Sequence, residues 1–96
     1  MIIGGRRGCG KTTELIHIAS EKDLYIVCAS YQRVKHVAKL ADKLELKIKY
    51  PITIEELPLR SSFIKEVLVD DMEDVLCSLI GKPIYKASTS MEIQEM

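Results

Sequence analysis

The chain has 96 residues, and its 14 lysines and arginines balance its 14 aspartates and glutamates. A chain of this length builds one core, so we expect residues 1–96 to form a single domain. Because the charges cancel, no net field attracts nucleic acid or a membrane to the chain as a whole, and any such contact has to come from a local patch.

The cysteines and the lengths of the apolar runs indicate in which cellular compartment the protein is expected. Cys9, Cys28 and Cys77 form no C-x-x-C pair and are odd in number, which argues against a disulfide framework or a zinc site. No apolar run approaches the roughly 18 to 20 residues that cross a bilayer, and the N-terminus lacks the hydrophobic region of a signal peptide. We therefore expect a cytoplasmic protein without a membrane contact.

A glycine-rich motif opens the chain. Gly5-Arg6-Arg7-Gly8-Cys9-Gly10-Lys11-Thr12 fills the G-x-x-x-x-G-K-[ST] pattern at every fixed position. A short apolar run, residues 1–3, precedes it, and Leu15, Ile18 and Ala19 follow at helical spacing. Between a strand and a helix, such a loop directs backbone N–H groups and the positive end of the helix dipole at the β- and γ-phosphates of a nucleotide. The alternative is a chance glycine-rich turn before a helix.

This motif resembles the Walker A motif of the P-loop NTPases, and the resemblance implies ATP and Mg²⁺ as cofactors. Lys11 would place its charge on the β- and γ-phosphates and act in catalysis, and Thr12 would place its hydroxyl on the metal. The expected nucleotide-binding residues are Gly5, Arg6, Arg7, Gly8, Cys9, Gly10, Lys11, Thr12 and Thr13.

Next in the chain come a strand and a helix. Residues 24–29 form a continuous apolar run rich in β-branched and aromatic residues, which is typical of a buried parallel strand. Ser30 can cap the following helix. The apolar residues that line one face of this helix are Val34, Val37, Ala38, Ala41 and Leu44.

The other face of this helix is basic. Its cationic side chains are Arg33, Lys35, His36, Lys39 and Lys43. A solvated helix face is one interpretation, because lysines are ordinary on exposed helices. A nucleic-acid contact through Arg33, Lys35, Lys39 and Lys43 is the other.

Two short elements are predicted before the next chemical signal. Residues 46–50 alternate apolar and charged side chains, which predicts a half-exposed edge strand that Pro51 ends. Thr53-Ile54-Glu55-Glu56 has the capping-box pattern of a short helix, which Pro58 would stop.

Val67-Leu68-Val69-Asp70-Asp71 is the second chemical signal. Three apolar residues predict a buried strand, and the carboxylates follow its C-terminal end, where ligands of open α/β sheets bind. The segment resembles a Walker B motif, which implies that Asp70 orients Mg²⁺ and that Asp71 polarises the attacking water. The alternative is that both acids begin the helix expected over residues 72–80, whose N-terminal dipole favours them.

The C-terminal part of the chain gives weaker signals. Gly81 ends the expected helix, and residues 84–87 predict one more short strand. A polar residue at the tip of that strand resembles the sensor position of helicases, for which Thr89 is the first candidate and Ser88 the next. Thr89-x-x-Glu92 equally fits a capping box for a short tail helix.

In their order these elements resemble the first half of a RecA-type core, as found in helicases, AAA ATPases, and phage DNA-packaging and loader ATPases. The resemblance implies a three-layer α/β/α sandwich with a mainly parallel sheet of four to five strands. It implies a Mg-ATP-binding protein that works with nucleic acid or a nucleic-acid-handling partner.

Hydrolysis stays open at this stage, because the chain has no recognised arginine finger. Arg6, Arg7 and Arg60 are internal candidates, and a homo-oligomer or a larger ATPase could supply one across an interface. A non-catalytic nucleotide-binding or interaction module is the alternative function. A small-molecule kinase is disfavoured, because no R-x-x-x-R lid is present.

Overall fold

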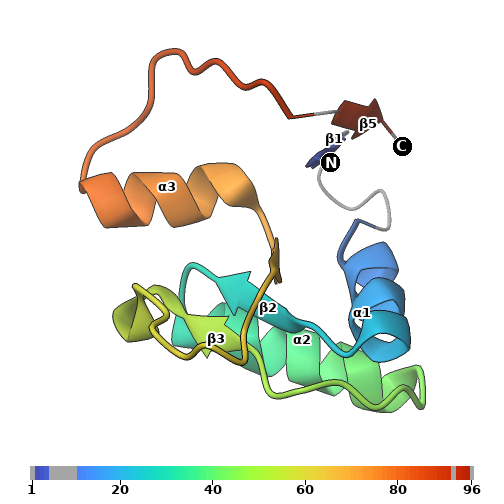
Figure 1. Ribbon diagram of the computed structural model, residues 1–96. Helices are drawn as coiled ribbons and strands as arrows, with labels where there is room; N and C mark the ends of the chain where they lie inside the picture. Colours follow the sequence, from blue (N-terminus) through green and yellow to red (C-terminus); the bar gives the residue numbers. More distant parts are fainter. Residues whose placement is uncertain (1, 5–10, 92, 96) are drawn as a thin grey trace.

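The computed structural model describes residues 2–4, 11–91 and 93–95. Its elements, in chain order, are β1 (Ile2–Gly4), α1 (Lys11–Lys22), β2 (Tyr25–Cys28), α2 (Tyr31–Lys43), β3 (Ile52–Thr53), the 3₁₀ helix η1 (Ile54–Glu56), β4 (Val67–Val69), α3 (Met72–Ile80) and β5 (Ile93–Glu95), as Figure 1 shows. No helix in this described part of the chain is both long enough and apolar enough to cross a membrane.

The main sheet has three strands in the order β3-β2-β4, and both pairings are parallel. β1 and β5 pair with each other, also in parallel, and lie apart from this sheet in Figure 1. The described residues therefore form a small α/β fold with three α-helices and a three-stranded all-parallel sheet. The expectation of one sheet of four to five strands differs from this arrangement, because β1 and β5 do not join the other three strands.

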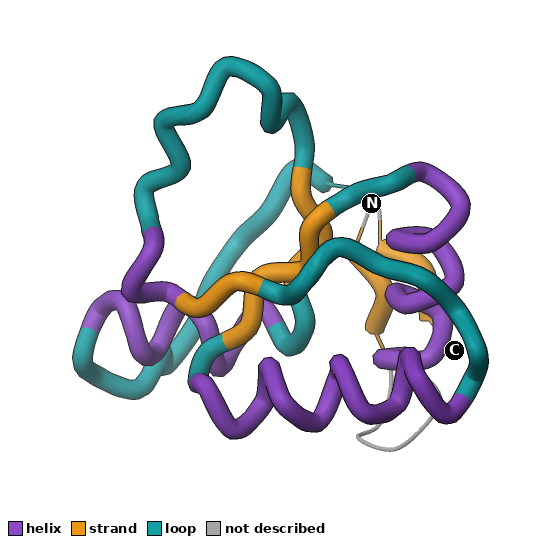
Figure 2. The backbone as a smooth tube through the Cα atoms, turned by 90° about the horizontal axis from the view of Figure 1, so that it is seen from below, coloured by secondary structure: helices purple, strands orange, loops and turns teal. Residues whose placement is uncertain are grey.

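The core lies on both faces of β2, because successive side chains of a strand point to opposite sides. On one side, Ile26 and Cys28 pack with buried residues of α1 and α2. On the other side, Val27 packs with Ile52 of β3 and Val75 of α3. Figure 2 shows the strands of the main sheet near the centre, with helices on more than one side of them. The carboxyl end of β2 lies beside the end of β4, where the Asp70 backbone N–H donates to the Val27 carbonyl, and α2 begins three residues after β2 ends.

Several predicted boundaries are confirmed by the local hydrogen bonds. Ser30 caps α2, where its hydroxyl accepts from the Arg33 backbone N–H at 3.3 Å. The Thr53 backbone N–H donates to the Glu56 carboxylate at 3.1 Å, as the capping-box pattern predicts, and the helix it begins is the single 3₁₀ turn of η1. Gly81 ends α3 at φ 82°, a left-handed conformation that glycine adopts without a Cβ penalty.

The edge strand predicted over residues 46–50 is absent, since this segment has no regular structure. Leu46 and Ile48 do pack against the core, which explains the alternating pattern. Lys49 lies 3.5 Å from the Asp23 carboxylate and 5.0 Å from the centre of the Tyr25 ring. Side-chain contacts therefore hold this segment beside the start of β2, and backbone pairing begins only at β3.

The strand predicted over residues 84–87 is also wrong, as is the alternative of a tail helix after Thr89. Tyr85 is 94% exposed, so the apolar residues of this segment do not mark a buried strand. Regular structure resumes at β5, which pairs with β1. Strand formation depends on an available partner more than on local composition, and β1 is such a partner for residues 93–95.

Candidate functional site

The candidate site joins the first turn of α1 to the end of β4. The Thr12 hydroxyl donates to Asp70 Oδ1 at 3.0 Å, across 58 positions of sequence. The Asp70 backbone N–H continues the parallel ladder by donating to the Val27 carbonyl at 2.9 Å. Asp70 thus lies at the carboxyl end of the sheet, and only 3% of its surface is exposed. The Walker A-like threonine and the first Walker B-like acid are in direct contact.

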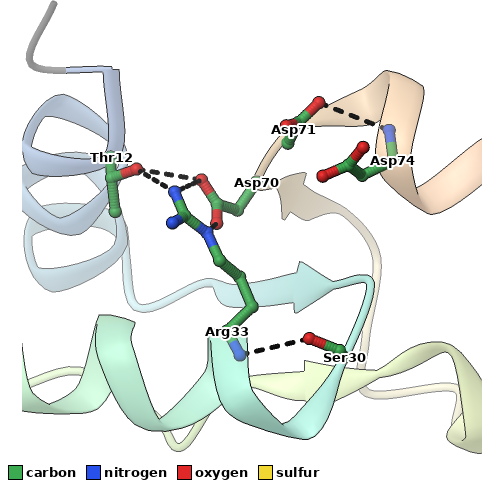
Figure 3. A network of polar contacts seen from close by, with 6 residues as sticks. All are labelled: Thr12, Ser30, Arg33, Asp70, Asp71 and Asp74. Carbon is green, nitrogen blue, oxygen red and sulfur yellow. Dashed lines mark hydrogen bonds and ion pairs between the residues drawn. The ribbon is translucent and has the colours of Figure 1, made fainter. Parts of the chain in front are cut away.

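Arg33 completes this cluster from the first turn of α2, as Figure 3 shows. Its Nε donates to Asp70 Oδ2 at 2.5 Å. Its Nη2 donates to Thr12 Oγ1 at 2.9 Å and lies 3.4 Å from Asp70 Oδ1. The hydrogen bond to Asp70 raises the pKa of Arg33 above its ordinary value. The guanidinium therefore stays charged and compensates the buried carboxylate.

Cys28 lies at the end of β2 beside this cluster, but its thiol is not a candidate nucleophile. Burial, and secondarily the negative charge of Asp70, raises the pKa of Cys28 to about 12, while the positive charge of Arg33 opposes this shift. The reactive form of cysteine is the thiolate. At neutral pH Cys28 is protonated and contributes to the core.

Asp71 adopts a different position from its neighbour Asp70. It is the N-cap of α3, and its carboxylate accepts from the Asp74 backbone N–H at 3.3 Å. Its φ of 59° places it in the left-handed region, and in Figure 3 its side chain points away from Thr12 and Arg33. The helix-start interpretation thus describes Asp71 and not Asp70. A role of Asp71 in polarising water stays a prediction.

The other predicted site residues are placed as follows. Gly5, Arg6, Arg7, Gly8, Cys9 and Gly10 lie outside the described residues. Lys11 is the first residue of α1, and Thr13, which is partly buried, lies in the same turn. The Thr89 hydroxyl accepts from the Met91 backbone N–H at 3.0 Å in an exposed loop, and the strand whose tip it was expected to occupy is absent.

The basic face of α2 is only partly as predicted. Lys35, Lys39 and Lys43 are exposed, and the Lys35 ammonium lies 4.9 Å from the centre of the Tyr31 ring. Arg33, in contrast, turns into the site and pairs with Asp70. Any nucleic-acid contact of this helix would therefore depend on the three lysines.

Arg33 is the site residue that sequence reasoning missed, because it was grouped with the surface cations of its helix. The position of Arg33 relative to the preceding strand could have indicated its role. Ser30 caps the helix directly after a buried parallel strand, so Arg33 had to lie in the first turn at the carboxyl edge of the sheet. Ligand-binding and catalytic side chains of open α/β sheets gather at that edge.

The donor set is suited to a hard cation. In the described residues, no three or more His, Cys, Asp or Glu side chains gather as a metal site. Mg²⁺, however, commonly takes one or two protein oxygens and fills its remaining positions with phosphate oxygens and water. Thr12 and Asp70 provide a hydroxyl and a carboxylate oxygen 3.0 Å apart, which fits that mode of binding.

Comparison with known proteins gave no match to this chain among family models, curated proteins or solved structures. The functional inference therefore depends on the motif and on the geometry of the Thr12, Arg33 and Asp70 side chains.

Proposed function

We propose that this protein is a small P-loop nucleotide-binding protein that binds Mg-ATP, with Lys11 on the phosphates and with Thr12 and Asp70 on the metal. The observation that supports this proposal is the 3.0 Å hydrogen bond between Thr12 and Asp70. The two motifs were identified independently, more than fifty positions apart, and a metal-nucleotide site requires their oxygens to meet. A chance glycine-rich turn carries no such requirement.

The electrostatics of the site agree with an anionic ligand accompanied by a cation. Thr12 and Lys11 lie in the first turn of the twelve-residue helix α1, and the positive end of a helix dipole favours a phosphate at such a turn. Asp70 is a nearly buried negative charge on the other side of Thr12. A divalent metal between this carboxylate and a phosphate chain would balance both.

Calorimetric titration with Mg-ATP tests the proposal. Lys11→Ala removes a cation from the phosphates, and a lost charge-assisted hydrogen bond of about 1.5 to 3 kcal/mol corresponds to a loss of affinity of about tenfold or more. Lys22→Ala is the matched control, because Lys22 is exposed at the opposite end of the same helix. Equal affinity of Lys11→Ala and wild type would refute the assignment.

A second candidate function is a non-catalytic nucleotide-binding or interaction module. It is favoured by the hydrogen bonds of two residues that were predicted to act in hydrolysis: Asp71 accepts from the Asp74 backbone N–H as the cap of α3, and Thr89 accepts from the Met91 backbone N–H in an exposed loop. Phosphate release from Mg-ATP, measured alone and with single-stranded DNA, double-stranded DNA or RNA, distinguishes the two functions. Turnover that appears only with a nucleic acid would also identify the partner.

A further inference from the structure

The Arg33 guanidinium contacts both of the side chains whose oxygens are assigned to the metal. It donates to both carboxylate oxygens of Asp70, to Oδ2 at 2.5 Å and more weakly to Oδ1 at 3.4 Å, and to Thr12 Oγ1 at 2.9 Å. The contact with Asp70 is a charge pair in which the carboxylate side chain is 3% exposed and the arginine side chain 39% exposed. A positive charge is therefore already present at the proposed metal position.

Mg²⁺ and this guanidinium would compete for the same lone pairs. The Thr12 hydroxyl donates its proton to Asp70 and accepts from Arg33. As a metal ligand it would have to direct a lone pair at the metal, and the Asp70 oxygen would do the same. A cation of either kind satisfies the buried carboxylate, and the short contacts leave no room for both in one place.

We propose that Arg33 is a built-in counter-cation that takes the place of Mg²⁺ in the nucleotide-free protein and is displaced when the metal-nucleotide complex binds. This inference rests on the proposed function. The exposed fraction of Arg33 provides its route, since the guanidinium can swing into solvent about a backbone held by the Ser30 cap. Asp70, with its surface covered, has no such freedom.

Displacement has a consequence that can be measured. The protein must break the Arg33 contacts before the metal can bind, so the wild type needs more Mg²⁺ than a variant without the guanidinium. At the same time, the nucleotide-free variant has a buried carboxylate with no cation, and it should melt at a lower temperature. Binding of the metal-nucleotide complex should then restore more stability to the variant than to the wild type.

Arg33→Gln tests this inference. Binding of the non-hydrolysable analogue AMPPNP is followed by calorimetry across a Mg²⁺ series, and thermal melting is recorded with and without Mg-AMPPNP. We expect the half-maximal Mg²⁺ concentration to fall by about tenfold, in line with the loss of one charge-assisted contact. Lys39→Gln is the control, because it removes an equal charge from an exposed position on the same helix.

Each outcome decides between the alternatives. An unchanged or higher Mg²⁺ midpoint in folded Arg33→Gln would overturn the inference, and a higher midpoint would mean that Arg33 helps to hold the nucleotide. If Arg33→Gln does not fold, Arg33→Lys takes its place, because lysine keeps the positive charge but lacks the planar, two-pronged guanidinium. Its Mg²⁺ midpoint should lie below that of the wild type by less than about tenfold. An unchanged midpoint in Arg33→Lys would overturn the inference. A wild type that binds no AMPPNP at any Mg²⁺ concentration would refute the proposed function itself.

Discussion

The pair formed by Arg33 and Asp70 should respond very differently to the loss of either partner. Removing the guanidinium with Arg33→Gln leaves a carboxylate that is 3% exposed without its cation. An unpaired buried charge of this kind costs about 3 kcal/mol. Asp70→Asn instead leaves Arg33, which is 39% exposed and can turn toward water. The amide also retains an acceptor oxygen, so the expected cost is about 1 kcal/mol after allowance for solvent screening.

Urea denaturation and thermal melting measure this asymmetry in metal-free buffer. A gap of about 2 kcal/mol corresponds to roughly 8 to 16 °C in melting temperature for a domain of this size. The double variant Arg33→Gln/Asp70→Asn should be more stable than Arg33→Gln alone, because no uncompensated charge is left in the interior. Lys39→Gln should melt like the wild type.

Two results would refute this reasoning. If Asp70→Asn destabilised the protein as much as Arg33→Gln, the energetic cost would not come from a buried carboxylate. If the effects of the two single changes simply added in the double variant, the side chains would not be coupled, although contacting partners normally show a coupling energy of at least about 0.5 kcal/mol.

Three further predictions concern other features of the chain. Asp71→Ala should lower stability in urea denaturation by about 1 to 2 kcal/mol, because it loses the cap and because alanine lacks the local hydrogen bonding that helps Asp and Asn to adopt the left-handed conformation of this position. Asp71→Asn should retain most of that stability, and equal losses in the two variants would exclude a capping role. Cys28, which is buried, should react with a thiol reagent at pH 8 far more slowly than Cys77. The free energy of unfolding should fall between pH 9 and about 12, because the unfolded chain ionises the Cys28 thiol near its ordinary pKa of 9.0 while burial keeps the thiol protonated in the folded protein. A Cys28→Ala variant with the same dependence of stability on pH would contradict this origin. If the basic face of α2 binds nucleic acid, charge reversal at Lys35 and Lys39 should weaken binding for all sequences, and binding should weaken steeply with salt; a salt-independent affinity would exclude this surface.

Local signals in the sequence were sufficient for much of the fold. The cap at Ser30, the apolar run of β2 and the left-handed Gly81 each determine an element from a few neighbouring residues, and each element is found where it was expected. The strands over residues 46–50 and 84–87 could not be decided in this way. An alternating or short apolar pattern reports partial burial, and backbone pairing depends on a partner strand that lies far away in the sequence.

The sequence predicted the two oxygen-bearing side chains of the site, Thr12 and Asp70, but not the guanidinium of Arg33 that pairs with them. Thr12 and Asp70 belong to two motifs whose spacing relative to strand and helix is characteristic, so their contact could be expected from residue order alone. Arg33 belongs to no motif, and its sequence neighbours are surface lysines. Its side chain reaches Asp70 because α2 packs on the sheet through Val34 and Val37, and this packing is a tertiary feature that local sequence does not encode.

The backbone between Asp70 and Asp71 explains why two adjacent carboxylates have separate environments. Asp70 directly follows β4, where its backbone N–H still donates to the Val27 carbonyl, and its side chain points into the cluster with Thr12. At Asp71 the chain turns through a left-handed conformation into α3, which sends the next carboxylate toward the Asp74 backbone N–H. If Asp71 left this cap to polarise a water at the phosphates, the lost hydrogen bond would cost about 1 kcal/mol. In that case helix capping and the proposed role in hydrolysis would compete for one side chain, and Asp71→Asn would keep the cap while removing the charge that polarises a water.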